Sequence, residues 1–167
     1  QVLNKNIDNF FGWVKGAKLV ELKDCNPEED PVRPELDNKF RTGYGRKIFG
    51  VEYLGEIHAV MCFAYTNKIP KSVDELEKLS TDAFLQTAMR DQSGGQIAIA
   101  YTVWSKKKGG GKLIVKEVFK KIKKSNHLNR LVTLSPLTEM ATNFHERNGA
   151  KLIQINETTQ NFEYKVL

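Results

Sequence analysis

The chain has 167 residues, of which 40% are hydrophobic and 28% charged, and its net charge is +6. This length suits one domain with a sizeable buried core, and the composition excludes an intrinsically disordered chain. No apolar run approaches the roughly 20 residues that cross a membrane. No signal-peptide pattern follows Gln1, so we expect a cytoplasmic protein with no membrane partner.

The first half of the chain predicts one helix followed mainly by strands. In chain order we expect a helix over 4–15, a strand over 17–23, a long loop over 25–44, and hairpin strands over 46–53 and 56–66. The long loop contains three prolines and many charges. Loops of this length in compact domains often act as lids or binding segments.

The second half predicts alternating helices and strands. In chain order we expect helices over 72–79 and 81–90, a strand over 96–105, a helix over 110–125, a strand over 130–135, a helix over 137–148, and strands over 150–156 and 160–166. Ser72 and Glu75 form a capping box, and Gly149 ends the last helix. This order predicts that residues 1–167 form a single α/β (α+β) domain, in which helices flank a mixed central sheet.

Two cysteines occur, Cys25 and Cys62. Their spacing fits neither a metal site nor a disulfide framework, so we expect no bound metal. Cys62 lies in an apolar run, and we interpret it as a buried free thiol of a reducing compartment.

The positive charge is concentrated in one segment. Ten basic residues stand there against one acid, Glu117. The basic residues are Lys106, Lys107, Lys108, Lys112, Lys116, Lys120, Lys121, Lys123, Lys124 and Arg130. Such a cluster indicates either one local anionic partner or a solvated helix face. The helix over 110–125 fits both, because its apolar residues share one face and its lysines the other.

Three consecutive glycines, Gly109 to Gly111, separate the strand over 96–105 from the helix over 110–125. Glycine lets the N–H groups of a helix start approach a ligand closely, and the helix dipole favours negative charge there. The loop therefore predicts a diphosphate site. Two common phosphate motifs do not fit. Leu113 stands where a Walker motif needs Ser or Thr, and the Gly-x-Gly-x-x-Gly dinucleotide pattern is absent.

Two blocks resemble the GNAT acyltransferase superfamily. Lys106-x-x-Gly109-x-Gly111 is similar to its Arg/Gln-x-x-Gly-x-Gly/Ala loop, and residues 141–150 are similar to its Ala-x-x-Phe-Tyr-Glu-x-x-Gly-Phe block, with His145 in the Tyr place. The resemblance implies a GNAT-like fold with an acyl-CoA site at splayed strands and a coenzyme A thioester as substrate. The residues that it assigns to coenzyme A are Val103, Trp104, Ser105, Lys106, Gly109, Gly110, Gly111, Lys112 and Asn143.

Residues 45–167 resemble malonyl-CoA decarboxylases more closely. Residues 133–136 are similar to that family's Thr-Leu-Ser-Pro block, and residues 143–150 to its Asn-Phe-His-x-x-Asn-Gly-Ala block. The resemblance assigns catalytic roles to Ser135 and His145. This chain departs from the family in having only nine residues between the two, where the family has a long insertion. Without the resemblance, Ser135 is equally a candidate cap of the helix after Pro136.

The closer resemblance implies decarboxylation of malonyl-CoA, or a close analogue, to acetyl-CoA and CO2. Loss of CO2 leaves an enolate, which requires stabilised charge on the thioester oxygen and a proton at carbon. Histidine titrates near neutrality, so we expect His145 to donate or relay that proton. We expect Ser135 to hydrogen-bond the carboxylate or the thioester, and both side chains to face one crevice beside residues 103–105.

Two other functions stay open. An acetyl-CoA-dependent N-acetyltransferase would use the same loop, with His145 protonating the thiolate, a small amine as acceptor, and Glu52 or Glu56 as a candidate base. A non-catalytic module would bind nucleic acid through the lysine-rich helix. The last hypothesis leaves the three glycines and the Ser135–His145 pair unexplained, so we do not favour nucleic acid as the partner.

Overall fold

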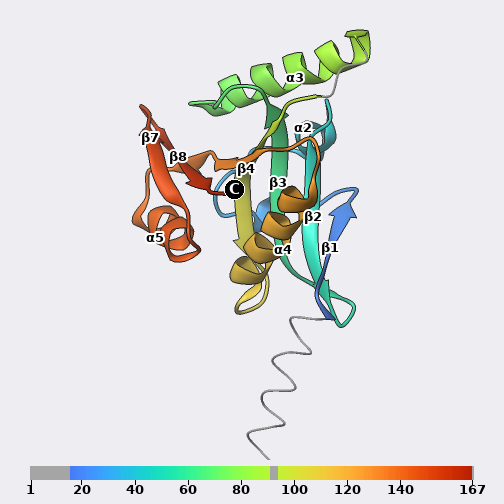
Figure 1. Ribbon diagram of the computed structural model, residues 1–167. Helices are drawn as coiled ribbons and strands as arrows, with labels where there is room; N and C mark the ends of the chain where they lie inside the picture. The colour runs from blue at the N-terminus through green and yellow to red at the C-terminus, as the bar shows by residue number, and fades with distance from the viewer. Residues whose placement is uncertain (1–15, 91–93, 167) are drawn as a thin grey trace, which may run out of the picture.

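One mixed β-sheet runs through residues 16–90 and 94–166, the part of the chain that the computed structural model describes (Figure 1). Its strands are β1 (Lys18–Leu22), β2 (Lys47–Tyr53), β3 (Glu56–Thr66), β4 (Ile97–Ser105), β5 (Arg130–Thr133), β6 (Ser135–Pro136), β7 (Lys151–Ile155) and β8 (Thr159–Tyr164). Their order is β1-β2-β3-β4-β5-β8-β6, and β7 pairs with β8. β4 and β5 run parallel while β3 and β4 run antiparallel, which confirms the mixed sheet. The helix predicted over 4–15 lies outside the described residues.

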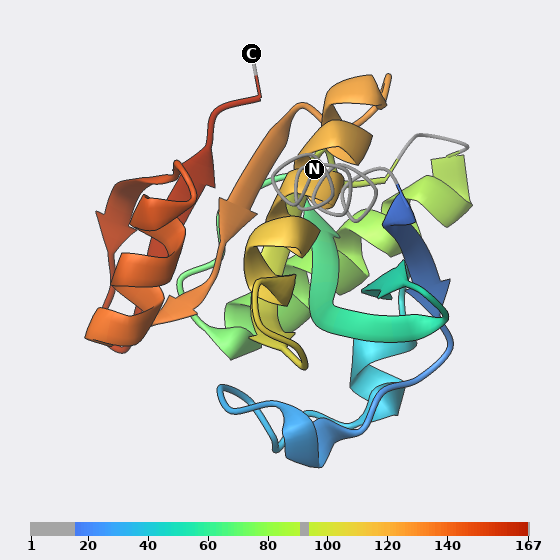
Figure 2. The ribbon, with the colours of Figure 1, turned by 90° about the horizontal axis from the view of Figure 1, so that it is seen from below.

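Helices cover both faces of this sheet. They are the 3₁₀ helix η1 (Pro27–Glu29), α2 (Asn38–Thr42), α3 (Val73–Arg90), α4 (Gly110–Lys124) and α5 (Glu139–Arg147). Figure 2 shows α4 and the segment 25–44, drawn blue to cyan, on opposite sides of the sheet. One apolar core lies under α4, and a second contains side chains of α2 and α3. Among the described residues, no helix is long and apolar enough to cross a membrane.

The amphipathic pattern of α4 builds the first core. Its buried apolar side chains are Leu113, Ile114, Val115, Val118 and Ile122, and they join Phe49, Met61 and Phe63 of the sheet. Burying one such side chain stabilises the fold by roughly 1.5–3 kcal/mol before the loss of chain entropy is counted. The apolar face predicted from the sequence is therefore confirmed. The lysines of α4 are exposed, and one of them, Lys121, places its ammonium group 5.5 Å from the centre of the Phe49 ring on β2.

The hairpin prediction is also confirmed, whereas the prediction of two helices over 72–90 is wrong. Leu54 and Gly55 both have positive φ, 52° and 78°, as a tight hairpin turn requires. The helix starts where expected, because Ser72 Oγ accepts the Glu75 N–H at 3.1 Å. It does not break at Ser80, since that hydroxyl donates to the Leu76 carbonyl at 2.7 Å and stays satisfied inside the helix.

The strand predicted over 130–135 is split in two. β5 pairs with β4 only as far as Thr133 opposite Ala100, while Ser135 begins β6 and pairs with Gln160 of β8 instead. The last bond to β4 runs from the Leu134 N–H to the Ala100 carbonyl, at 3.0 Å. The two parallel strands therefore separate beyond this point and leave an opening between them.

The helix after this opening begins later than predicted. Thr138 is its N-cap, accepting the Ala141 N–H at 3.2 Å, and the first helical residue is Glu139. Ser135 therefore does not cap the helix, and its hydroxyl is available for another role.

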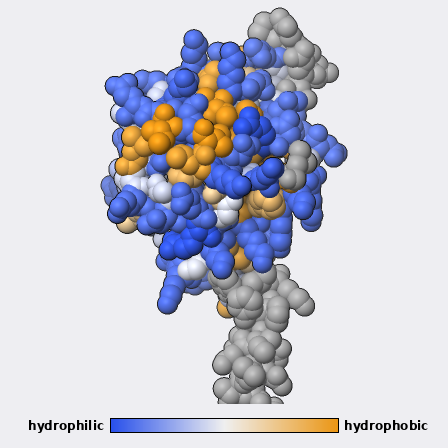
Figure 3. Space-filling view, turned by 60° about the vertical axis from the view of Figure 1, so that its left-hand side comes forward, coloured by the Kyte–Doolittle hydropathy of each residue, from blue (hydrophilic) through white to orange (hydrophobic). Residues whose placement is uncertain are grey.

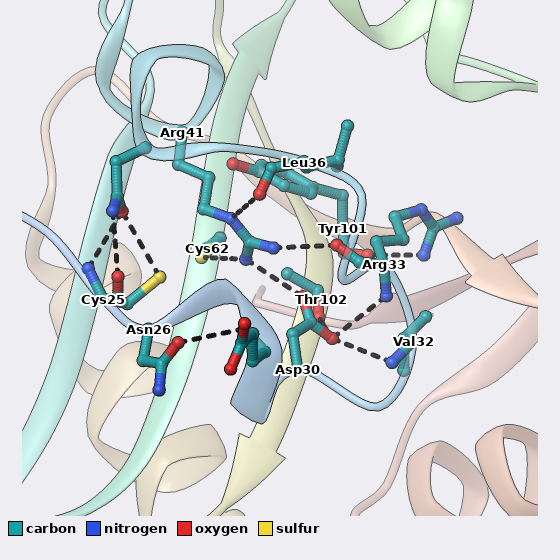
Figure 4. A network of polar contacts seen from close by, with 12 residues as sticks. Cys25, Asn26, Asp30, Val32, Arg33, Leu36, Arg41, Cys62, Tyr101 and Thr102 are labelled. Atoms are coloured by element: carbon teal, nitrogen blue, oxygen red, sulfur yellow. Dashed lines mark hydrogen bonds and ion pairs between the residues drawn. The ribbon is translucent and has the colours of Figure 1, made fainter.

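The segment 25–44 is an ordered part of the second core and contains η1 and α2. At its centre Asp30 Oδ2 lies 2.9 Å from Arg41 Nη1, and both side chains are fully buried. Asp30 Oδ1 accepts the Thr102 hydroxyl at 2.8 Å, and Arg33 Nη1 donates to the Tyr101 carbonyl at 2.7 Å (Figure 4). These buried bonds fix the segment to β4. The segment is therefore a fixed part of the structure, and not the movable lid that its length suggested.

Replacement of Arg41 by Met should destabilise the protein strongly, because it leaves the Asp30 carboxylate buried without its cation. Losses of about 3–5 kcal/mol are typical when one partner of a buried ion pair is removed. The free energy of unfolding in urea measures the effect. The control is Lys39→Met on the exposed side of α2, where a change of about 0.5 kcal/mol or less is expected. Equal stability of the two variants would contradict the structural role given to the pair.

Candidate active site

A cavity of about 290 Å³ fills the opening where β4 and β5 separate. One wall is β4 residues 100–105, and the second is the chain at 134–136 with the inner face of α5. Residues 29, 31 and 32 of the fixed segment form the third wall. Among the described residues no Lys or Arg side chain lines the cavity, and the surface is mostly apolar.

His145 reaches this cavity from the last turn of α5 and is 6% exposed. Its Nδ1 lies 2.8 Å from Tyr164 Oη, and its ring stacks on Phe162 with centroids 5.4 Å apart. Burial lowers the pKa of His145 to about 4. The expectation of an imidazole that titrates near neutrality is therefore wrong, because the buried site disfavours the charged ring. If Tyr164 donates to Nδ1, the neutral ring carries its proton on Nε2.

Ser135 lies on β6, on the same wall as α5, and is 3% exposed. Its Oγ is 2.8 Å from Thr133 Oγ1, and Thr133 Oγ1 also accepts the Phe162 N–H at 3.0 Å. The hydrogen bond to Thr133 fixes the serine hydroxyl at the point where β5 ends and the chain begins to pair with β8. The structure thus brings the two residues with predicted catalytic roles to one cavity, beside Val103 and Ser105.

Two supporting residues, Thr133 and Tyr164, were not predicted as part of the site. Each contacts one member of the predicted pair through a hydroxyl group. Tyr164 does belong to the Asn161-Phe162-x-Tyr164 run, which echoes the closing strands of malonyl-CoA decarboxylases, so the sequence carries a signal for it. Thr133 belongs to the Thr-Leu-Ser-Pro block, but the block does not reveal its contact with Ser135, because that contact depends on the split between β5 and β6.

The glycine loop enters α4 at one end of the cavity. Gly109 has φ +81° and forms the N-cap of α4. A Cβ on Gly110 would overlap the His58 carbonyl oxygen, and a Cβ on Gly111 would come 2.8 Å from the Phe144 ring. A side chain at position 110 would therefore face β3 and not a diphosphate bound at the helix start. The glycines allow the loop to pack closely against β3 and α5.

The backbone amides of this loop divide into two groups. Several are satisfied internally: Lys106 and Lys107 donate to the His58 carbonyl, Gly110 to the Lys107 carbonyl, and Gly111 to Ser105 Oγ. The N–H groups of Lys108, Gly109 and Lys112 donate to no acceptor within residues 16–90 and 94–166. These three donors, at the positive end of a 15-residue helix, are the ones that remain for an anion.

The other residues predicted to bind coenzyme A take different positions. Trp104 lies in the second core, with the Arg41 guanidinium 5.6 Å from its ring, and Lys106 forms an ion pair with Glu29 at 3.4 Å. Lys112 is exposed on α4. Asn143 is exposed on α5 and lines a separate shallow depression, so the structure does not bring it to the cavity.

The acids suggested as a transferase base also lie elsewhere. Glu52 pairs with Lys18 at 3.7 Å, and Glu56 pairs with Lys107 at 3.9 Å. Neither lines the cavity, whereas Glu29 does. Sequence reasoning missed Glu29 because its place depends on how the segment 25–44 folds back onto β4.

The mouth of the cavity is apolar on the α5 side. Figure 3 turns this side of the molecule forward and shows hydrophobic residues gathered on its surface. The exposed large apolar residues of α5, β7 and the connection before α5 are Leu137, Met140, Leu152, Ile153 and Ile155. Met140 is 83% exposed and lines the cavity, so it marks the outer edge of the opening.

Comparison with known proteins rests on structure. No protein-family model matches the sequence, and a search of curated proteins finds no significant match. The GphF GNAT-like decarboxylase in complex with isobutyryl-CoA aligns with a TM-score of 0.67 at 9% identity, over 90% of this chain and 100% of that one. A Bacillus subtilis acetyltransferase in complex with CoA aligns with a TM-score of 0.57 at 10% identity, over 90% and 99%.

Malonyl-CoA decarboxylase from Cupriavidus metallidurans aligns with a TM-score of 0.50 at 18% identity. The alignment covers 81% of this chain and 35% of the decarboxylase, so this chain spans about a third of that protein's length. The chain has a GNAT-like fold. The predicted fold class and its likeness to malonyl-CoA decarboxylase are confirmed. Of these three solved structures, two are decarboxylases and one is an acetyltransferase, and two contain CoA or isobutyryl-CoA.

Replacement of Gly110 by Ala should destabilise this GNAT-like domain by about 1–3 kcal/mol, the usual cost of overpacking. The added methyl group must push the glycine loop away from the His58 carbonyl of β3. Urea unfolding measures the loss. Lys108→Ala, two residues earlier and exposed, is the matched control and should leave stability almost unchanged. Wild-type stability in Gly110→Ala would show that the close approach is not required.

The stability of the domain should fall as the pH drops from about 6.5 to about 4, in part because of His145. The unfolded chain binds a proton at His145 near pH 6.5, whereas the folded chain binds it only near pH 4. This one group accounts for a loss of about 3 kcal/mol across that window. The measurement is the difference in unfolding free energy between wild type and His145→Gln at each pH. A difference that does not change with pH would contradict a neutral, buried His145.

Proposed function

We propose that this protein binds a coenzyme A thioester and decarboxylates malonyl-CoA, or a close analogue, to acetyl-CoA and CO2. The observation that carries the proposal is the pair Ser135 and His145, both buried and uncharged, on the walls of an apolar cavity that no Lys or Arg of the described residues lines.

The glycine loop supports the binding of coenzyme A. A diphosphate at the start of α4 would accept hydrogen bonds from the three free amides of Lys108, Gly109 and Lys112. The exposed ammonium groups of Lys108 and Lys112 add positive charge at the same place. From there the pantetheine arm would run into the opening between β4 and β6, which would carry the thioester into the cavity.

The cavity suits a reaction in which a carboxylate loses its charge. A cation beside the carboxylate would stabilise the substrate more than the transition state, in which the charge spreads toward the thioester. As the bond to CO2 breaks, its electron pair moves onto the thioester to form an enolate. The Ser135 hydroxyl would donate to the enolate oxygen, where its hydrogen bond strengthens as charge develops.

His145 would complete the reaction by protonating the enolate carbon. An enolate is basic enough to take a proton from a neutral imidazole N–H, so the low pKa of His145 does not prevent this role. In the same step the Tyr164 hydroxyl, 2.8 Å away, would pass its proton to Nδ1 and keep the ring neutral. Water would then return a proton to Tyr164 after the product leaves.

The closed wall at residues 29–32 favours decarboxylation over acyl transfer. Transfer requires a second substrate beside the thioester, while decarboxylation does not. On the sheet face away from α4, Pro31 and Val32 line the cavity, and Asp30 beside them is fixed by the Thr102 hydroxyl. An acceptor would have to displace this segment, which the buried Asp30 fixes to β4.

One observation favours the alternative, an acetyl-CoA-dependent N-acetyltransferase. Glu29 lines the cavity, and its side chain is 41% exposed. A carboxylate there would attract a small cationic amine and could accept its proton.

The hypothesis of a nucleic-acid-binding module rests only on the outward lysines of α4 and gains no support from the cavity.

Incubation with malonyl-CoA alone separates these functions. We expect acetyl-CoA to form with no amine present. Replacing either Ser135 or His145 by Ala should lower the rate at least about 100-fold and leave coenzyme A affinity nearly unchanged, because neither residue contacts the glycine loop. Glu146→Gln, next to His145 but exposed, is the matched control.

Two results would contradict the proposal. One is that acetyl-CoA is consumed only when an amine is added and malonyl-CoA stays intact, which is the transferase outcome. The other is that His145→Ala decarboxylates malonyl-CoA as fast as Glu146→Gln does.

A further inference from the structure

Two thiol groups meet on the face of the sheet that carries the segment 25–44. Cys62 lies on β3 and is fully buried, while Cys25 precedes η1 and is half-buried. Cys25 Sγ lies 3.5 Å from Asn38 Oδ1, and each thiol affects the pKa of the other. Arg41 Nη1 lies 3.5 Å from Cys62 Sγ, and Figure 4 shows both sulfur atoms beside this arginine. The proposed decarboxylation uses none of these groups.

The position of Cys25 is fixed by its backbone. The Cys25 N–H donates to Asn38 Oδ1 at 2.9 Å, and Asn38 Nδ2 donates back to the Cys25 carbonyl at 2.9 Å. Arg41 is fixed in the same way, because it donates to the carbonyls of Leu36 and Arg33 as well as contacting Asp30. The fold therefore fixes the backbone of Cys25 and the guanidinium of Arg41, which lies beside both sulfurs in Figure 4.

The surroundings make the two thiols chemically different. The neighbouring Cys62 thiol lowers the pKa of Cys25 to about 7, and the charge of Arg41 acts in the same direction against burial and the carboxylates of Asp30 and Asp24. The neighbouring Cys25 thiol and burial raise the pKa of Cys62. Since the thiolate is the nucleophile, Cys25 is the residue that reacts first, and it is also the more accessible one.

We propose that Cys25 is a modification site for disulfide reagents and that Cys62 resolves the product to an intramolecular disulfide. In the first step the Cys25 thiolate attacks a small disulfide RSSR, the S–S bond breaks, and RS⁻ leaves. In the second step the Cys62 thiol loses its proton to solvent, its sulfur attacks Cys25 Sγ, and a second RS⁻ leaves. Two protein thiols are oxidised and one RSSR is reduced to two RSH.

The new bond would join β3 to the segment that forms the third wall of the acyl cavity. Cys25 lies five residues before Asp30, whose neighbours Pro31 and Val32 line that cavity. The bond would close a long loop of chain, which restricts the unfolded state and so raises the melting temperature. The site goes beyond the proposed function and does not depend on it.

The test uses the full chain and glutathione disulfide, followed by alkylation of the remaining thiols and mass spectrometry of the peptides. For wild type we expect loss of both free thiols, no retained glutathione, and a cross-linked peptide pair containing Cys25 and Cys62. Dithiothreitol should restore both thiols, and the melting temperature should be higher in the oxidised form.

Two variants assign the order of the steps. Cys62→Ala should stop at one glutathione on Cys25, whereas in Cys25→Ala the Cys62 thiol should stay free. A stable glutathione adduct in wild type, or two free thiols after treatment that modifies an unfolded sample fully, would overturn the proposal. The wild-type cross-link decides the question even if a variant fails to fold.

Discussion

The last hydrogen bond between β4 and the strand beside it runs from the Leu134 N–H to the Ala100 carbonyl, at 3.0 Å. Beyond this bond the chain changes partners, and Ser135 pairs with Gln160 of β8. The change opens the sheet, leaves the backbone of β4 to line a cavity, and places the Ser135 hydroxyl at its edge. It also sets where α5 begins, and therefore where His145 points. The site depends on this one break in a parallel pair.

The electrostatics of the site follow from burial. His145 is surrounded by Phe144, Phe162 and Tyr164, and its imidazole stays neutral because nothing nearby compensates a charge. The charges that do occur nearby are placed outside the cavity or are paired, as with Asp30 and Arg41. The same ion pair closes the cavity wall opposite α4. One buried network thus fixes the third wall of the cavity to β4.

Local signals in the sequence were sufficient for much of this fold. The glycine loop, the amphipathic α4 and the hairpin at Leu54 were predictable because each depends on residues within a few positions of one another. The place of Ser135 and His145 in one cavity was predictable from the resemblance of two short blocks. The continuity of α3 through Ser80 was not, because it depends on where one buried hydroxyl donates.

The features that the sequence could not predict depend on contacts between distant parts of the chain. The break at Leu134 depends on competition between β4 and β8 for one strand, and the pair Asp30–Arg41 depends on how a charged segment folds back on itself. The neighbour of Gly110 is a carbonyl of β3, some fifty residues earlier in the chain, and the low pKa of His145 comes from the depth of its burial. Each of these features depends on how separate helices and strands pack together, and a local sequence pattern does not predict such packing.

A crystal structure with a malonyl-CoA analogue that cannot lose CO2 tests the account most directly. We predict the diphosphate on the amides of Lys108, Gly109 and Lys112, and the malonyl group in the cavity between Ser135 and His145. A malonyl group that lies outside this cavity, or a diphosphate held away from the start of α4, would contradict it.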